Sequence, residues 1–353
     1  MRFFEPTRGI RHREKRPVGT LPDTNQINEM MQNVEEYVEL LSANQDVVGI
    51  TLGGGLSRGY GDALSEIDLN IYIKEEKLSD WVKGHGSLPQ GDHQGTKYHM
   101  DVGFLSLVAE KKEVWSTLKK WDASYTKILY DPSGKIEKLL ASKDEFNAEE
   151  KQSIALGNYL DCVYFGDIVV RQWTLRDDPL VANQMITKGI PALCNLLFLA
   201  NDEYPPFEKW LINYSYSLQW KPVNWKKRLE AITIVKKLSL TEVERRSIEF
   251  MRLYREVWGK VVGDEYRETG LLELEAFETL IYVIREKPKV EAFKEKYDIK
   301  QLGYENLYKL AEIKTVEGEE RIIFNVDRFN EERINGFPSF LHWNREMLEH
   351  IKV

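Results

Sequence analysis

The chain has 353 residues, of which 42% are hydrophobic and 30% are charged. This composition excludes a disordered chain and is ample for two packed domains. The formal net charge of −8 argues against a protein that follows a nucleic-acid backbone, because such proteins usually carry a basic face. An acidic surface suits a cationic acceptor or a small molecule better.

Residues 1–19 are predicted to form an irregular basic arm, which carries Arg2, Arg8, Arg11, Arg13, Lys15 and Arg16. Two interpretations stay open for it: a solvated tail or structural lid, and a segment that touches a polyanion. The N-terminus lacks a signal-peptide core, and no apolar run reaches the length of a membrane span. The two cysteines, Cys162 and Cys194, lack CxxC spacing. We therefore expect buried free thiols in a cytoplasmic protein with no membrane partner.

Residues 20–143 are predicted to form an α/β domain. The apolar spacing predicts a helix over residues 23–43, a short helix at 75–83 and a further helix over 108–120. Strands are expected at 47–52, 67–73, 98–107 and 127–130. The glycine-rich stretch 84–95 is expected to be a loop.

Helical periodicity dominates residues 144–290, which we expect to be an all-helical substrate-binding domain. The candidate helices are 147–171, 179–201, 206–218, 223–236 and 240–261. Residues 291–353 are expected to be a C-terminal extension packed on the helical domain. They could hold a hairpin around Glu317-Gly318 and a closing helix at 339–351.

The most informative stretch is a strand that feeds a glycine loop and returns as an acidic strand. After the strand at 47–52 come Gly53, Gly54 and Gly55, and about ten residues later Glu66 and Asp68. Side chains alternate along a strand, so both carboxylates are expected on one face. Such adjacent like charges are unfavourable unless a cation neutralises them, and hard oxygen ligands suit Mg²⁺.

A third carboxylate, Asp101, lies between apolar Met100 and Val102 in a strand that could pair beside the first acidic strand. Three carboxylates on neighbouring strands can hold two metal ions and support in-line displacement at phosphorus. The loop supplies the complement, because Gly54 and Gly55 let backbone N–H groups approach phosphate oxygens. Ser57 and Arg58 could add a hydroxyl and a cationic fork.

This pattern resembles the signature of the DNA polymerase β-like nucleotidyltransferase superfamily, an apolar-Gly-[Gly/Ser] loop followed by [Asp/Glu]-apolar-[Asp/Glu]. It is most similar to bacterial antibiotic nucleotidyltransferases and their uncharacterised relatives. Gly54, Arg58-Gly59 and the run Ser65-Glu66-Ile67-Asp68-Leu69 match their motif, and Asp101 matches their third acidic strand. Two positions depart: Gly55 stands where serine is commoner, and Glu66 where aspartate is usual.

The resemblance implies a nucleotidyltransferase domain with a mixed sheet, followed by an all-helical domain that closes over the nucleotide. It implies Glu66, Asp68 and Asp101 as catalytic metal ligands, Asp101 serving also as a possible proton acceptor. ATP or another NTP would be the co-substrate, with two Mg²⁺ ions, and a nucleoside monophosphate, expected to be AMP, would pass to a hydroxyl of a small acceptor.

Lys209 belongs to the segment 204–210, where the helices predicted at 179–201 and 206–218 meet, and relatives often supply a lysine to the triphosphate there. Packing between helices is the alternative role for this segment. Two other functions also stay open: adenylylation of a protein or an RNA end, and a non-catalytic nucleotide-binding regulator. The acceptor itself is not named by the sequence.

Overall fold

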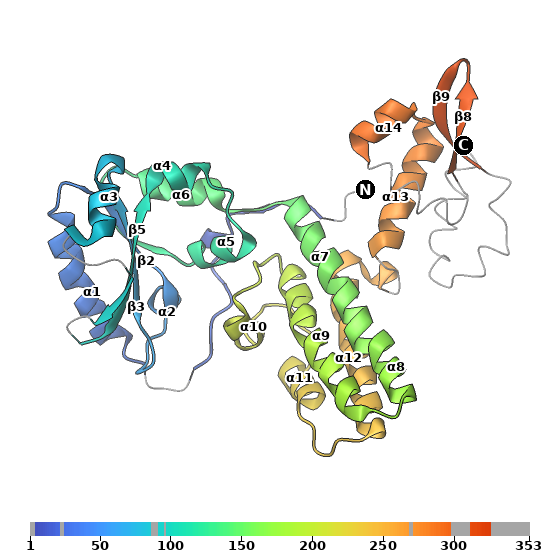
Figure 1. Ribbon diagram of the computed structural model, residues 1–353, viewed down its shortest axis with the longest axis horizontal. Helices are drawn as coiled ribbons and strands as arrows, with labels where there is room; N and C mark the ends of the chain where they lie inside the picture. The colour runs from blue at the N-terminus through green and yellow to red at the C-terminus, as the bar shows by residue number, and fades with distance from the viewer. Residues whose placement is uncertain are drawn as a thin grey trace.

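The computed structural model describes residues 4–21, 25–85, 91–94, 97–267, 271–297 and 311–325. Within these residues the chain is α+β, with a mixed sheet in its first half and helices in its second half. Figure 1 shows the sheet with its helices at one side of the molecule and helices α7 to α12 at the other.

The five-stranded sheet has the strand order β4-β5-β3-β2-β6. Only β3 and β5 pair in parallel; the other neighbours are antiparallel. The strands are β2 (Val47–Leu52), β3 (Ile67–Ile73), β4 (Gly91–Gln94), β5 (His99–Ser106) and β6 (Lys127–Tyr130). Four of them were predicted from sequence. The expectation of a loop over 84–95 was wrong at its end, because β4 pairs there with the edge of β5.

Helices cover both faces of this sheet. The successive β3 residues Ile71 and Tyr72 belong to two different apolar clusters, as strand alternation requires. Ile71 packs with α1 (Ile27–Ser42) through Met30, Val34 and Leu41. Tyr72 packs with α6 (Lys135–Lys143) through Ile136, Leu139 and Leu140.

The helix predicted over 108–120 is in fact two helices, α4 (Leu107–Lys112) and α5 (Thr117–Ala123). The break has a local cause. Ser116 is extended and its hydroxyl accepts from Lys119 N–H, which starts a new helix, while Trp115 is buried in the cluster around α6. The break gives α5 its own direction and brings its residues to the mouth of the candidate site.

The second half is built around α9 (Pro179–Leu199), which carries eleven buried residues. Asp178 caps it by accepting from Leu180 and Val181 N–H groups. Around it lie α7 (Ala148–Val163), α8 (Val169–Leu175), α10 (Glu208–Ser215), α11 (Trp225–Thr233) and α12 (Leu240–Val262). The helix predicted over 147–171 contains a π-helical turn, η4 (Tyr164–Ile168). A Cβ on its Gly166 would lie 2.3 Å from Phe250 Cε1, so the close approach of α12 requires glycine there.

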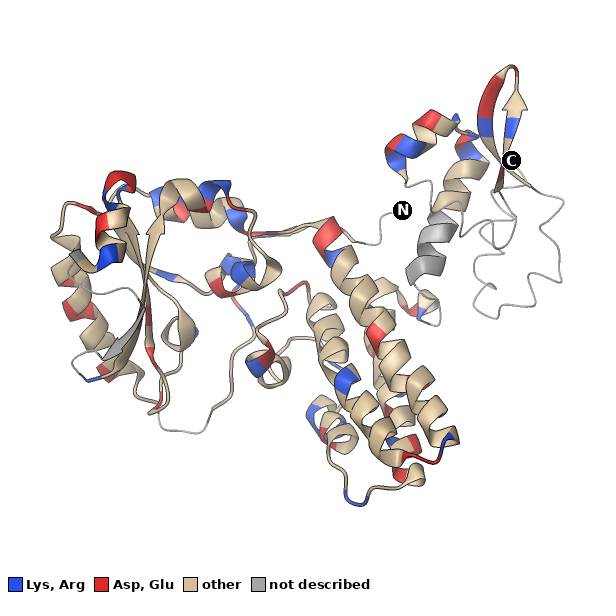
Figure 2. Cartoon of the chain, viewed as in Figure 1, with Lys and Arg blue, Asp and Glu red and all other residues tan. Residues whose placement is uncertain are grey.

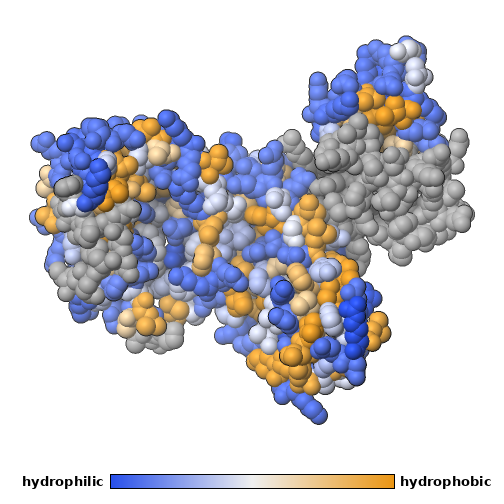
Figure 3. Space-filling model, in the orientation of Figure 1, coloured by the Kyte–Doolittle hydropathy of each residue, from blue (hydrophilic) through white to orange (hydrophobic). Residues whose placement is uncertain are grey.

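By length and composition alone, the stretch Ala148–Leu175 could cross a membrane. No apolar run of that length was predicted from the sequence. Only 28% of its most apolar window is buried, and Leu160 and Leu175 are among its exposed residues. Figure 3 shows hydrophobic surface over this part of the molecule. The same stretch also contributes Cys162 and Val170 to the core shared with α9 and α12, as a core helix does. Cys162 and Cys194 are buried free thiols, as predicted.

The last described elements share their own apolar cluster. They are α13 (Leu271–Glu286), α14 (Val290–Lys296) and the hairpin strands β8 (Ala311–Val316) and β9 (Glu319–Phe324). The predicted hairpin is present, and Glu317 and Gly318 both adopt positive φ at its turn. The closing helix expected at 339–351 lies outside the described residues.

The N-terminal segment is not a free tail over residues 4–21, because it contacts both halves. Its β1 (Thr7–Arg8) pairs with β7 (Glu145–Phe146), and Arg16 forms a buried ion pair with Glu203 over 2.9 Å. Arg16 also donates to the Ser124 carbonyl over 3.0 Å. Thr20 N–H then donates to Asn213 Oδ1 in α10 over 2.8 Å. The segment therefore straps the helical half to the sheet.

Candidate functional site

The glycine loop holds its backbone directly against an acidic side chain. Gly53 N–H donates to the Asp68 carbonyl over 2.9 Å, and the next residues form one helical turn, α2 (Gly54–Ser57). Gly54 has a φ of +59°, and a Cβ there would lie 1.6 Å from Asp68 Oδ2. Both the conformation and the space therefore require glycine at this position.

Asp68 and Asp101 lie side by side in the sheet. The parallel register pairs Asp68 of β3 with Asp101 of β5. Two residues further along both strands, it places Asn70 opposite Gly103. Glu66 precedes β3 and is exposed, so it lies at the entrance to the strand rather than on it. The expected third acidic strand is thus adjacent to the first.

Negative charge is concentrated at Asp68. Burial raises the pKa of its carboxyl to about 7, and the nearby Glu66, Asp122 and Asp101 carboxylates raise it too, while Arg58 opposes them. A carboxyl pKa that burial and neighbouring carboxylates raise is a common feature of functional clefts. A cation close to Asp68 would relieve this repulsion.

The side chain of Arg58 is held by Asp122, a residue that the sequence pattern did not indicate. Arg58 Nη1 donates to Asp122 Oδ1 of α5 over 2.7 Å, and the guanidinium lies 4.8 Å from the centre of the Trp121 ring. The Arg58 side chain is only 6% exposed, whereas that of Asp122 is 47% exposed. Asp122 itself is one of the residues that line the cavity described below.

Helix α10 brings Lys209 to the same place from the helical half. The ring of Trp210 lies 5.1 Å from that of Tyr60, just after the glycine loop, and 5.9 Å from that of Tyr214. Lys209, in the first turn of α10, is exposed and forms no ion pair within the described part of the chain. Its ammonium lies 5.9 Å from the Trp210 ring centre. The contact between Trp210 and Tyr60 thus positions the neighbouring Lys209, which has no ion-pair partner among the described residues, near the acidic strands.

These groups surround one cavity of about 560 Å³, which we call the acidic cavity. Five of the sequence-predicted residues line it: Gly54, Arg58, Asp68, Asp101 and Lys209. Further lining residues include Asn70, Gly103, Trp121, Asp122, Phe207 and Trp210. A cavity of this volume that is lined by both carboxylates and cations suits a small charged ligand.

Three predicted residues are not part of that lining. Glu66 lies beyond it, near enough to Asp68 to act on its pKa. Ser57 Oγ donates to the Gly54 carbonyl over 2.9 Å and supports the loop from behind. A Cβ on Gly55 would lie 2.9 Å from Tyr60 Cε2, so this glycine makes room for the Tyr60 ring.

The carboxylates do not converge on one point. In the part of the chain that the structure describes, no group of three or more His, Cys, Asp or Glu side chains stands where it could hold a metal ion.

Two residues that line the acidic cavity, Asn70 and Asp122, were not predicted from the sequence, and they differ in whether a sequence pattern could have indicated them. Asn70 follows Asp68 by two residues on a strand, so the alternation that pairs side chains on one face could have found it. Asp122 has no such signal, because it lies on a helix whose direction depends on the break before Ser116.

The chain was compared with known families, curated proteins and solved structures. No known family matches this chain, and no curated protein is similar to its sequence. One solved structure that is similar is a nucleotidyltransferase-like protein from Exiguobacterium sibiricum. It is 11% identical, with a TM-score of 0.39, and the match covers 84% of this chain and 99% of that one. The chain is thus distantly similar in structure to this nucleotidyltransferase-like protein.

Proposed function

We propose that this protein is a metal-dependent nucleotidyltransferase. It would transfer a nucleoside monophosphate, AMP in the simplest case, from an NTP to a hydroxyl of a small acceptor. The observation that supports this most is the meeting of Asp68 and Asp101 in parallel register beside Gly54, in a cavity that Lys209 enters from the other half.

The acidic cavity carries charged groups for both substrates, cations for the triphosphate and a carboxylate for the acceptor hydroxyl. Lys209 and Arg58 are the cations that would contact the triphosphate, and glycine backbone at Gly53 and Gly54 allows its oxygens a close approach. The acceptor oxygen would form a bond to the α-phosphorus while the bond from that phosphorus to the bridging oxygen of pyrophosphate breaks. Asp101, which is exposed, would take the proton of the acceptor hydroxyl.

The donor set also fits a divalent cation. Asp68 and Asp101 are adjacent carboxylates that offer hard oxygen donors, Glu66 lies close by, and burial together with the neighbouring carboxylates raises the pKa of Asp68. These residues would hold Mg²⁺, whose charge would stabilise the attacking and leaving oxygens. The protein's own part is to keep the two carboxylates in register and to orient the phosphates.

The test is a screen of NTPs and an acceptor library for Mg²⁺-dependent pyrophosphate release. We expect release that needs both an NTP and an acceptor. A protein that binds NTP but releases no pyrophosphate with any acceptor would be a regulator. Release only in the presence of RNA or a protein would instead indicate the macromolecular alternative.

A further inference from the structure

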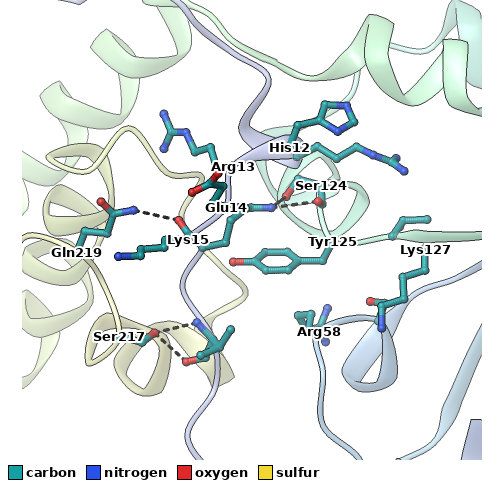
Figure 4. A pocket seen from close by; sticks show the side chains of 15 residues that line it. His12, Arg13, Glu14, Lys15, Arg58, Ser124, Tyr125, Lys127, Ser217 and Gln219 are labelled. Atoms are coloured by element: carbon teal, nitrogen blue, oxygen red, sulfur yellow. Dashed lines mark hydrogen bonds between the residues drawn. The ribbon is translucent and has the colours of Figure 1, made fainter.

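A second cavity lies on the other side of Arg58, between the N-terminal segment and the sheet. It has a volume of about 970 Å³ and we call it the basic cavity. Arg58 lines both cavities. Figure 4 shows Lys15, Ser217 and Gln219 on one side of the Tyr125 ring and Lys127 on the other.

The lining of the basic cavity is strongly positive in a protein whose net charge is −8. It contains one carboxylate, Glu14, and six Lys or Arg side chains: Arg11, Arg13, Lys15, Arg16, Arg58 and Lys127. Elsewhere, as Figure 2 shows, acidic and basic residues are interspersed along the helices of both halves. This concentration of one sign is therefore a local feature of the cavity.

Some of these cations already have partners. Arg13 and Arg16 pair with Glu203, Arg11 lies 3.3 Å from Glu137, and Arg58 is paired with Asp122. These four hold the fold together and would contribute only part of their charge to a ligand.

Two lysines are different. Lys15 and Lys127 are exposed, come from the N-terminal segment and from β6, and have no ion pair within the described residues. Their ammonium groups are free to meet an anion.

Two guanidinium groups also carry unused donors. Arg11 Nη1 and Arg58 Nε are buried, and neither has a hydrogen-bond partner among the described residues. Because both atoms are inaccessible, a ligand in the cavity would not contact them directly, and Arg11 and Arg58 contribute positive charge from the cavity wall.

We propose that the basic cavity binds a small anion that carries two or more phosphate groups. Lys15 and Lys127 would contact the phosphates from opposite sides, and Arg11 and Arg58 would add charge from the cavity wall. A single phosphate would leave most of 970 Å³ empty, whereas a bisphosphate or an oligophosphate could span the two lysines. The basic cavity shares only Arg58 with the lining of the acidic cavity, and the proposal does not depend on nucleotidyl transfer.

A nucleic acid is the less suitable occupant. A polymer needs a basic track that continues beyond one pocket, and the two free lysines are all that the unpaired lining offers to a backbone. A compact ligand matches this locally concentrated positive charge better.

The experiment is calorimetric titration of the full-length protein with inorganic tripolyphosphate, and separately with a sugar bisphosphate, in buffer with EDTA. We expect saturable binding of at least one of them that weakens at high salt. The double variant Lys15→Glu/Lys127→Glu should raise Kd by roughly tenfold or more, since each lysine makes a charge-assisted contact. Tighter binding of tripolyphosphate would point to an inorganic chain, and tighter binding of the sugar bisphosphate to a phosphorylated metabolite.

Two controls separate this site from general charge and from the acidic cavity. Lys236→Glu/Lys237→Glu makes the same charge change at exposed lysines between α11 and α12, and should keep the wild-type Kd. Lys209→Met removes the free cation of the acidic cavity and should also keep it. The milder Lys15→Ala/Lys127→Ala variant repeats the test if charge reversal perturbs folding.

Four results would overturn the proposal. They are no binding of either anion by the wild type at millimolar concentration, equal Kd values for the cavity and control double variants, loss of binding in Lys209→Met, and far tighter binding of a single-stranded RNA than of either small anion.

Discussion

The rings of Tyr60 and Trp210 lie 5.1 Å apart, although 150 residues separate them in sequence. Tyr60 ends the glycine loop and Trp210 lies in the first turn of α10, so this contact joins the glycine loop to the helical half. Its consequence is the position of Lys209, whose side chain lines the acidic cavity. The cavity is thus assembled from both halves of the chain.

Lys209→Met tests whether that cation contacts the triphosphate. Methionine keeps most of the apolar stem, so the melting temperature should stay near that of the wild type. The lost charge-assisted contact, about 1.5–3 kcal/mol, corresponds to a fall of roughly ten- to hundredfold in kcat/KM for the NTP. The matched control is Lys237→Met, at an exposed lysine far from the cavity in sequence. Unchanged kinetics in Lys209→Met would assign Lys209 to helix packing and leave Arg58 as the main phosphate cation.

Gly54→Ala tests the close approach of the loop to Asp68. The new Cβ would lie 1.6 Å from Asp68 Oδ2, so the carboxylate must move and NTP affinity should be lost. Gly134→Ala is the control, because Gly134 has a similar φ of +63° but nothing within 4 Å of the added atom. Both variants should lose about 1–2 kcal/mol from backbone strain. Calorimetry that finds equal ATP affinity for both would place the phosphates elsewhere.

Asp68→Asn tests the charge cluster through stability of the metal-free protein. The folded-state pKa of Asp68, about 7, lies above the unfolded value of 3.8, so the native state binds more protons between these values. The stability that this carboxyl contributes is therefore present below pH 4 and lost as the pH rises through 7. The full shift is worth roughly 4 kcal/mol at 1.36 kcal/mol per unit of pKa.

In EDTA, Asp68→Asn should melt at a higher temperature than the wild type at pH 8, and the gap should shrink at pH 5. Mg²⁺ should stabilise the wild type at pH 8 and leave the variant unchanged, because a ligand that binds only the native state raises its stability. If the melting temperature of the wild type does not fall relative to that of the variant between pH 5 and pH 8, the carboxylates of this cluster do not repel one another as we infer.

Glu203→Gln tests the strap formed by the N-terminal segment. Glu203 is almost fully buried and accepts from Arg13 over 3.1 Å and from Arg16 over 2.9 Å. Removing its charge leaves Arg16 buried without a counterion, and should cost about 3–5 kcal/mol in denaturant unfolding. The control Glu145→Gln breaks the exposed pair with Arg8 and should cost less than about 1 kcal/mol. Similar losses in both variants would mean that burial of the Glu203 pair adds nothing.

Much of the framework could be predicted because its signals are local. The alternation of β3, the spacing of α7 to α12 and the turn at Glu317-Gly318 all follow from neighbours along the chain. The pairing of Asp68 with Asp101 was also expected, because each stands in an apolar strand. The sequence could not indicate Asp122, whose place depends on an ion pair with Arg58, 64 residues away.

The N-terminal segment shows the same limit. As a sequence it is a run of basic residues, equally compatible with a tail or a lid. Its course depends on buried partners such as Glu203, which lies 187 residues beyond Arg16. Long-range ion pairs leave no periodic pattern, so the strap and the basic cavity beneath it were not predicted.

Transfer of label from differently labelled ATP tests the central claim most directly. The protein is incubated with Mg²⁺, the acceptor library and ATP labelled at the α-phosphate or the γ-phosphate, beside Asp68→Asn as the matched control. We predict that α-label passes to an acceptor while γ-label appears only in pyrophosphate, and that both signals vanish in the variant. Release of γ-label as inorganic phosphate, or near wild-type label transfer in Asp68→Asn, would contradict nucleotidyl transfer at this site.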